Sequence, residues 1–298
     1  MIGTIATGNC YIGRFAPSPT GPLHLGSLIA AVISYLDARY HDGQWLVRME
    51  DIDPPREIKG AATQILHTLE RHGLQWDGNV RFQRHSAELH TAALRQLHQQ
   101  TQTYFCDCAR KKLIAAGLQS HYPGICRDKA LESGAIRVRT AMEPVGVEDR
   151  WQARLSTNLN ESPGDFIVRR RDQLVAYQLA VVVDDADQGV TDIVRGVDLY
   201  TSTPRQVWLQ HLLGLETPRY AHFPVLLGTD GTKLSKQTGA KGLDDERPAQ
   251  NLVEAFAHIG LEPDADASAR TASDWLAWAQ QQYQPNRIPL VSQLSDEP

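Results

Sequence analysis

Hydrophobic positions in the first part of the chain follow two different periods. Residues 11–16 and 45–49 are short apolar runs typical of buried strands, whereas residues 25–40 place apolar side chains at helical spacing. A second helix is predicted over about residues 57–71, after the break at Pro54 and Pro55. Because strands alternate with helices, the pattern predicts an α/β fold with a parallel sheet, whose ligands bind beyond the carboxyl ends of the strands.

The periodicity changes after about residue 104. Shorter strand-like segments are predicted at 135–139, 165–169 and 178–184, as parts of a smaller inserted α/β subdomain that returns to the main sheet at the last of them. A helix over about 204–213 and a strand at 222–227 are expected to complete the nucleotide-binding fold. The remainder is predicted to be helical, most clearly over 252–259 and 271–282.

Composition describes an ordinary globular chain. Of 298 residues, 42% are hydrophobic and 22% are charged, so one large or two moderate domains are expected. No apolar run approaches the roughly 18 residues of a membrane span, and the N-terminal stretch lacks the basic start and apolar run of a signal peptide. We therefore expect a cytoplasmic protein with reduced cysteines and no membrane partner.

Charge is unevenly distributed along the chain. The formal net charge is −5, and the last 60 residues carry 10 acidic and 4 basic side chains, so the rest is about neutral. Such an acidic tail repels an RNA backbone rather than following it. The cluster Arg169-Arg170-Arg171 is equally compatible with a phosphate contact and with a solvated charged edge.

The stretch "RFAPSPTGPLHLGSLIAA" indicates a phosphate site. Its prolines and Gly21 bend the backbone after the first strand, and Gly26 lets a ligand approach the start of the next helix. The free N–H groups of a helix start favour phosphate, and His24 adds a donor there. About 200 residues later, "TDGTKLSKQTGAKG" places Lys233 and Lys236 in a polar loop that could close over a triphosphate.

Together these two motifs resemble the signatures of the class I aminoacyl-tRNA synthetases, usually written H-I-G-H and K-M-S-K-S. Ser27 stands where the second histidine is usual, and Leu234 and Gln237 alter the second signature. "GRFAPSPTGPLHLGS", "RMEDIDPPR", "YQLAVVVDD" and "IVRGVDL" are similar to the glutamyl branch, over roughly the first 240 residues. The resemblance implies a Rossmann-type catalytic domain that activates glutamate with Mg-ATP, with His24, Lys233 and Lys236 as catalytic residues and His24, Gly26, Ser27 and Lys236 at the ATP.

Glutamate requires fixed cations for its two carboxylates and a fixed anion for its ammonium, and arginine suits a carboxylate best. The resemblance implies Arg14 and Arg195 as these cations, without assigning either to a particular carboxylate, and Glu50 as the anion. Tyr177 and Ser18 would add hydroxyls. The full set that it implies for the glutamate site is Arg14, Phe15, Ala16, Pro17, Ser18, Glu50, Tyr177 and Arg195.

Three cysteines lie close together in "YFCDCARKKLIAAGLQSHYPGICR". In a reducing compartment, Cys106, Cys108 and Cys126 favour one structural zinc ion over a disulfide, with three buried free thiols as the alternative. Zinc usually takes four ligands. The chemistry of the sequence favours His121 as the fourth, whereas the resemblance implies Tyr122. Cys10 stands apart and is expected to be structural.

The resemblance also implies the division of the chain. Residues 1–103 and 196–240 would form the two halves of the catalytic domain, 104–195 the inserted acceptor-binding subdomain with the zinc site, and 241–298 a helical stem-contact piece without an anticodon-binding domain. This is closest to truncated glutamyl-tRNA synthetase paralogues, which activate glutamate without tRNA and transfer it to queuosine in tRNA(Asp). We expect a monomer. The alternatives are an enzyme that charges a tRNA 3′ end and a non-catalytic RNA-binding paralogue.

Overall fold

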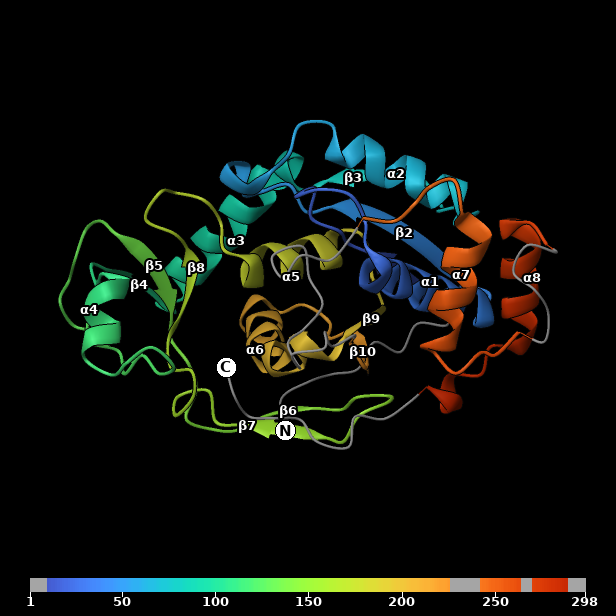
Figure 1. The fold of residues 1–298 in the computed structure, drawn as a ribbon. Helices are drawn as coiled ribbons and strands as arrows, with labels where there is room; N and C mark the ends of the chain where they lie inside the picture. Colours follow the sequence, from blue (N-terminus) through green and yellow to red (C-terminus); the bar gives the residue numbers. More distant parts are fainter. Residues whose placement is uncertain (1–9, 226–241, 264–269, 289–298) are drawn as a thin grey trace.

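A parallel sheet forms the centre of the structure, a computed structural model that describes residues 10–225, 242–263 and 270–288 (Figure 1). Its strands are β1 (Ile12–Phe15), β2 (Gln44–Met49) and β3 (Arg81–Phe82), paired in that order, and the parallel pair β9 (Asp192–Gly196) and β10 (Arg219–Phe223). The Thr191 amide donates to the Ile12 carbonyl at 2.9 Å, which places the start of β9 beside β1. The parallel sheet predicted from the sequence is confirmed.

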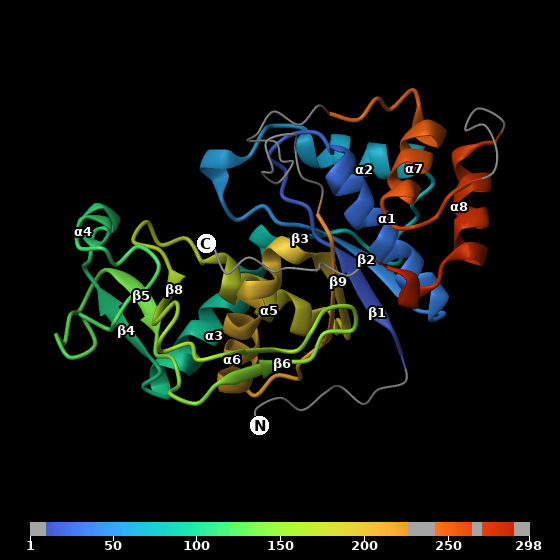
Figure 2. The ribbon, with the colours of Figure 1, turned by 60° about the horizontal axis from the view of Figure 1, so that its bottom comes forward.

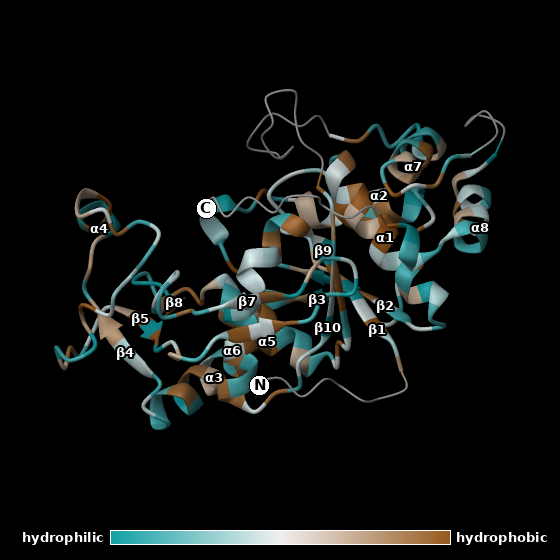
Figure 3. Ribbon diagram, turned by 90° about the horizontal axis from the view of Figure 1, so that it is seen from below, coloured by the Kyte–Doolittle hydropathy of each residue, from teal (hydrophilic) through white to brown (hydrophobic). Residues whose placement is uncertain are grey.

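Helices cover both faces of this sheet. One hydrophobic cluster joins α1 (Leu25–Tyr40) and α2 (Ala61–Arg71) to one face, and a second joins α3 (Ala87–Gln99), α5 (Tyr177–Asp187) and α6 (Thr203–Leu213) to the other. Along β9, Ile193 belongs to the second cluster and Val194 to the first, as the two-residue period of a strand requires. Figure 3 shows apolar residues concentrated in the central strands and in the helices packed on them.

A smaller antiparallel sheet lies at one end of the molecule. It consists of β4 (Thr103–Cys106), β5 (Ala135–Val138) and β8 (Phe166–Arg169), with the short helix α4 (Arg110–Ala115) beside it (Figure 2). A hairpin of β6 (Val145–Val147) and β7 (Leu155–Thr157) follows β5 along the chain. The strands predicted at 135–139 and 165–169 are therefore confirmed, within a residue at the ends.

Two helices pack at the opposite end. They are α7 (Pro248–Ala257) and α8 (Ala272–Gln282), and both contact α1, where Phe256 and Trp275 are fully buried (Figure 1). Thr271 caps α8 by accepting from the Asp274 amide at 3.2 Å, while the Asp274 carboxylate accepts in return from Thr271, a capping box. Within the described ranges, no helix is both long enough and apolar enough to cross a bilayer.

The strand predicted at 178–184 is wrong, because this segment lies in the helix α5. Val181, Val182 and Val183 favour a strand by propensity, but residues 179–185 are all buried between the sheet and the neighbouring helices α3 and α6. Residues 179–183 of this helix are all apolar, so this part of the sequence shows no amphipathic period. Burial thus overrides the local preference of the valines.

Other boundaries move for local reasons. The helix predicted from 57 begins at Ala61, after Gly60 in a left-handed conformation with φ of 83°. The helix predicted from 252 begins at Pro248, since proline suits the first turn. The strand predicted at 222–227 begins at Arg219, and residues 226–241 lie outside the described part of the chain.

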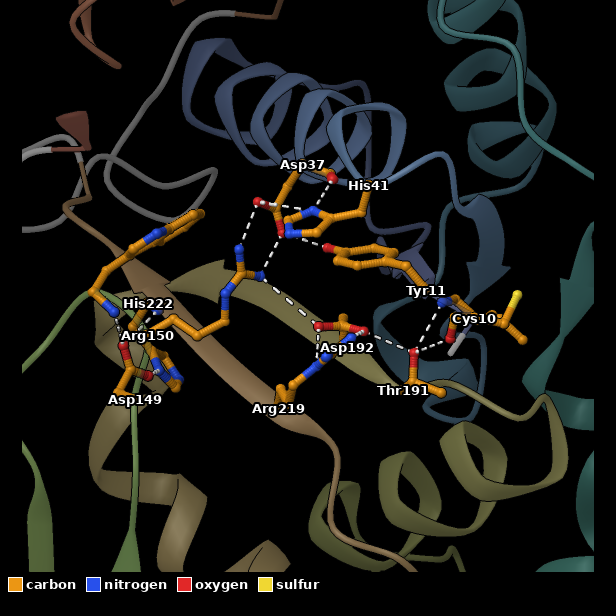
Figure 4. Close-up of polar contacts among 12 residues, drawn as sticks. Cys10, Tyr11, Asp37, His41, Asp149, Arg150, Thr191, Asp192, Arg219 and His222 are labelled. Atoms are coloured by element: carbon orange, nitrogen blue, oxygen red, sulfur yellow. Dashed lines mark hydrogen bonds and ion pairs between the residues drawn. The ribbon is translucent and has the colours of Figure 1, made fainter. Parts of the chain in front are cut away.

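A buried carboxylate in α1 ties distant parts of the chain together (Figure 4). Asp37 is fully buried and accepts from both terminal nitrogens of Arg150, at 2.6 and 2.9 Å. It also accepts from the hydroxyls of Tyr11, at 2.5 Å, and of Tyr283, at 3.1 Å. One side chain therefore joins the start of β1, the connection between β6 and β7, and the segment after α8.

Candidate active site

A cleft of about 580 Å³ opens at the carboxyl ends of β1, β2, β9 and β10. Every described residue that was predicted from the sequence to bind glutamate or ATP lines this cleft. These residues are Arg14, Phe15, Ala16, Pro17, Ser18, His24, Gly26, Ser27, Glu50, Tyr177 and Arg195. The two catalytic lysines predicted from the sequence, Lys233 and Lys236, lie outside the described residues. Arg14 and Tyr177 thus line the same cavity, although they are 163 positions apart in the sequence. The cavity lies beyond the carboxyl ends of the strands, where ligands of a parallel sheet are expected to bind.

The proline-rich loop after β1 is held against the segment that follows β2. The Pro17 carbonyl accepts from the Glu50 amide at 2.9 Å, and the Pro19 carbonyl accepts from the Ile58 amide at 3.0 Å. His24 then caps α1, because its Nδ1 accepts from the Ser27 amide at 3.3 Å. An accepting Nδ1 leaves the proton of the neutral ring on Nε2, so this histidine presents a donor at the helix start.

Two buried arginines share one buried carboxylate below the cleft. Arg14, at the cleft wall, donates from Nε to the Asp185 Oδ1 at 3.0 Å, and Arg48 donates from a terminal nitrogen to the same oxygen at 2.7 Å. Burial alone would raise the pKa of the Asp185 carboxyl, but the two guanidinium groups hold it below its usual value. Asp185 therefore stays ionised at neutral pH and fixes the Arg14 side chain.

Glu50 faces the same pair of arginines. Its carboxylate lies 3.6 Å from a terminal nitrogen of Arg48, and only 11% of its side chain is exposed. Burial raises the pKa of Glu50, and Arg48 and Arg14 offset part of that rise. Burial and the charge of Glu50 also raise the pKa of Tyr177, which keeps its hydroxyl protonated. The Glu50 carboxyl thus lines the cleft together with the guanidinium of Arg14.

Arg195 is fixed from the other half of the sheet. Its Nε donates to the Nε2 of His222 at 2.9 Å, and its terminal nitrogens donate to Gln206 at 2.8 Å and to Thr203 at 2.9 Å. The Nδ1 of His222 lies 2.5 Å from the Asp149 carboxylate (Figure 4). Since a guanidinium only donates, Nε2 accepts and Nδ1 carries the proton that it donates to Asp149.

The surroundings of His222 keep its ring neutral. Burial lowers the pKa of His222 to about 4, assisted by the nearby Arg195 and opposed by Asp149. A neutral ring is the form that can accept from Arg195, so protonation would remove the contact. Asp149 and His222 therefore act on the cleft through Arg195.

Sequence reasoning missed four of the residues that build this site; they are Arg48, Asp149, Asp185 and His222. Arg48 and Asp185 stand inside the quoted motifs "RMEDIDPPR" and "YQLAVVVDD". The assignment of 178–184 to a strand hid the fact that Asp185 lies on a helix facing β1 and β2. No sequence pattern indicated the contact of Asp149 with His222, because the two residues are 73 positions apart.

The second cluster of chemical interest is formed by cysteines. The sulfur atoms of Cys106, Cys108 and Cys126 all lie within 4.8 Å of one another, and the Tyr122 hydroxyl is 3.3 Å from the first and 3.6 Å from the second. Zinc–sulfur bonds of about 2.3 Å in a tetrahedron separate sulfur atoms by just under 4 Å, so the donors have suitable spacing. All three cysteines are free thiols.

The position of the tyrosine bears on the fourth donor. The Tyr122 hydroxyl also accepts from the Cys126 amide at 3.1 Å, and Arg137 lies over its ring at 3.6 Å. His121 has no atom in the group of potential ligands found in the described chain. This geometry favours Tyr122 over His121.

Comparison with known proteins agrees with this geometry. The model of the catalytic domain of class I tRNA synthetases (E and Q) matches residues 12–277. The chain belongs to this family. It is 49% identical over 289 residues to a protein of Pseudomonas aeruginosa named glutamyl-Q tRNA(Asp) synthetase, covering 96% of this chain and 98% of that protein. A protein of the same name from Pseudomonas syringae pv. tomato is 48% identical over 281 residues, covering 94% and 95%. The chain is therefore a class I synthetase-like ligase.

Two solved structures with this fold are longer than this chain. A glutamate tRNA ligase from Elizabethkingia meningosepticum, determined in complex with its amino acid, superposes with a TM-score of 0.76 at 22% identity. The match covers 93% of this chain and 65% of that one. A glutamate-tRNA synthetase from Elizabethkingia anophelis gives the same TM-score and identity, over 94% and 66%. These likenesses show that the fold is shared.

The neutral state of His222 has a measurable consequence. Because its pKa is lower in the folded protein, near 4, than the usual value of about 6.5, the unfolded chain binds the proton more readily as pH falls. This residue's share of the free energy of unfolding should fall by about 2 kcal/mol between pH 7 and pH 5. Urea unfolding of the wild type and of His222→Gln measures that share, and equal pH dependence in both proteins would contradict it.

Proposed function

We propose that this protein activates glutamate with ATP to form glutamyl-adenylate, without needing tRNA, and transfers the glutamate to the queuosine base of tRNA(Asp). The observation that carries the proposal is the charge pattern of the cleft. Arg14 and Arg195 are cations fixed by buried partners, and the Glu50 carboxyl lies at the end of β2, next to the strand that carries Arg14. This pattern complements an amino acid with two carboxylates and one ammonium.

The glutamate would be held by charge and by hydroxyls. Each arginine would bind one carboxylate, Glu50 would bind the ammonium, and Tyr177 and Ser18 would add hydrogen bonds from the cleft wall. Phe15, Ala16 and Pro17 line the same wall and would shape it. Asp185 and His222 would keep the two guanidinium groups in place before the substrate arrives, which lowers the cost of binding.

The ATP would lie at the start of α1. His24, Gly26 and Ser27 line the cleft there, where the helix end favours phosphate. A glutamate carboxylate oxygen attacks the α-phosphorus of Mg-ATP, and the bond to pyrophosphate breaks. Positioning and charge stabilisation suffice for this step, and His24, Lys233 and Lys236 are the residues that we expect to stabilise the phosphates.

The choice of acceptor rests on the relatives. The matches to proteins named glutamyl-Q tRNA(Asp) synthetase cover 94–96% of this chain and 95–98% of those proteins. In the transfer step, a hydroxyl of the queuosine ring attacks the glutamyl carbonyl and AMP leaves. An anticodon loop presents unpaired bases, which a cleft open at the end of a sheet can receive.

We further propose one structural zinc ion per chain, held by Cys106, Cys108, Cys126 and Tyr122. Burial opposes ionisation of the Cys106 thiol, but hydrogen bonds from Tyr122 and Arg137 lower its pKa, which favours the thiolate that zinc binds. The cysteines come from the end of β4 and from the segment between α4 and β5. Zinc would fix this irregular segment in the subdomain that meets the acceptor.

The test of the acceptor uses radiolabelled glutamate, ATP and three RNAs. We expect label on tRNA(Asp) that contains queuosine, and none on queuosine-free tRNA(Asp) or on tRNA(Glu).

Glu50→Gln should lower glutamate-dependent ATP–pyrophosphate exchange about 10²-fold, because it removes the partner of the ammonium. Glu70→Gln, on the exposed side of α2, should not change exchange.

Three outcomes would count against the proposed activity. Label on queuosine-free tRNA(Asp) would exclude queuosine as the acceptor. Label on the 3′ end of tRNA(Glu) would favour a charging enzyme. A complete lack of exchange with glutamate, glutamine and aspartate would favour a non-catalytic RNA-binding protein.

Metal analysis tests the zinc site. Freshly purified protein should contain about one zinc ion per chain. Cys108→Ser should lose most of the metal and make the segment between β4 and β5 more sensitive to proteolysis, while exchange stays largely intact. Cys10→Ser is the matched control, because Cys10 is exposed and belongs to no group of potential ligands found in the described chain. Metal-free wild-type protein, or full metal in Cys108→Ser, would refute the site.

A further inference from the structure

A second cavity of about 540 Å³ lies between the start of α3 and the inserted antiparallel sheet. We call it the α3 cavity. Residues of the segment after β2, of α3 and of β4, β5 and β8 form its walls, and none of them lines the cleft described above. The proposed activity leaves this cavity without a role.

A buried amide in the wall of the α3 cavity has no partner. Gln83 is fully buried, and neither its side-chain nitrogen nor its oxygen makes a hydrogen bond. The Nε of Arg169, which also lines the cavity, is buried and equally unpartnered. Unmade hydrogen bonds of buried groups reduce stability, so such groups commonly have a ligand or a functional reason.

The cavity is also positively charged. Arg84, Arg95 and Arg169 line it, against one carboxylate, that of Asp51. Asp51 is already occupied, since it accepts from the Arg84 amide at 2.9 Å and lies 3.2 Å from the Arg84 Nε. The remaining positive charge favours a phosphate.

Part of the wall is apolar and partly aromatic, beside polar side chains that include His90, Thr91, His98 and Gln173. Phe105 and Ile136 of the inserted sheet and Leu94 of α3 contribute to it. A planar group can stack on such a surface, and the donor and acceptor of a glutamine amide can pair with the edge of a nucleobase. Phosphate, planar ring and polar edge together describe one nucleotide.

Position connects the α3 cavity to the catalytic cleft. Glu50 lines the cleft, and the next residues, Asp51 and Ile52, line the α3 cavity. The two spaces therefore lie on either side of one short segment of backbone. A single strand with one base in the cleft can place a neighbouring nucleotide in the α3 cavity.

We propose that the α3 cavity binds an unpaired nucleotide of the acceptor RNA, next to the base that is modified. The Gln83 amide reads the edge of this base, and the arginines meet its phosphate. This inference rests on the proposed function, since it supposes that an RNA loop reaches the cleft.

The test uses Gln83→Leu, which removes the amide but keeps the size of the side chain. Because it replaces an unsatisfied buried group by an apolar one, the variant should be at least as stable as the wild type. Glutamate-dependent exchange should be unchanged, whereas the KM for a queuosine-containing anticodon stem-loop should rise about ten-fold. Gln99→Leu, at the exposed end of α3, is the matched control.

A modified acceptor separates base readout from a general effect on RNA. A stem-loop that is abasic beside the queuosine should bind the wild type about ten-fold more weakly, and Gln83→Leu should weaken it no further. Ala87→Trp, which fills the cavity from an exposed position, should weaken the intact stem-loop similarly. An unchanged KM in Gln83→Leu, or equal KM for intact and abasic stem-loops, would overturn the proposal.

Direct binding keeps this test independent of transfer. The dissociation constant of a fluorescent stem-loop is measured by anisotropy for the wild type and for Gln83→Leu. If no glutamate is transferred but the variant still binds the stem-loop about ten-fold more weakly, the result refutes the proposed activity and supports the nucleotide site in the α3 cavity. Equal dissociation constants refute the nucleotide site, whether or not transfer occurs.

Discussion

The cleft depends on one buried carboxylate shared by two arginines. Asp185, on α5, binds both Arg14 of β1 and Arg48 of β2, and none of the three side chains is more than 5% exposed. Two like charges buried side by side would repel one another, and the anion between them makes the arrangement possible. This contact fixes α5 against the first two strands, and it leaves Arg14 facing the cleft beside Glu50.

The second arginine of the cleft, Arg195 on β9, is fixed by a different kind of partner. Arg195 is held by neutral groups, His222, Gln206 and Thr203, with Asp149 behind the histidine. One cleft arginine is thus compensated by a carboxylate in direct contact, and the other only through an imidazole. The positive charge of Arg195 is less neutralised, so we expect it to attract an anionic substrate group more strongly.

Local periodicity predicted the parallel sheet and the first helix, whereas the residues that line the cleft came from the family resemblance that short motifs carry. The prediction of a strand at 178–184 was wrong, because Val181–Val183 lie in a buried part of the helix α5, where burial outweighs the strand propensity of valine. The supports of the arginines could not be predicted, because Arg14 and Asp185 are 171 residues apart. The α3 cavity is similarly formed by segments that meet only in the folded chain.

The central claim is that fixed charges in the cleft select an amino acid with two carboxylates. Calorimetric titration of the wild-type protein with L-glutamate and with L-glutamine tests it most directly, since the two ligands differ by one charge and little in shape. We predict that glutamate binds at least ten-fold more tightly, the order of effect of leaving a buried arginine without its anion. Equal affinity for the two amino acids would contradict the account.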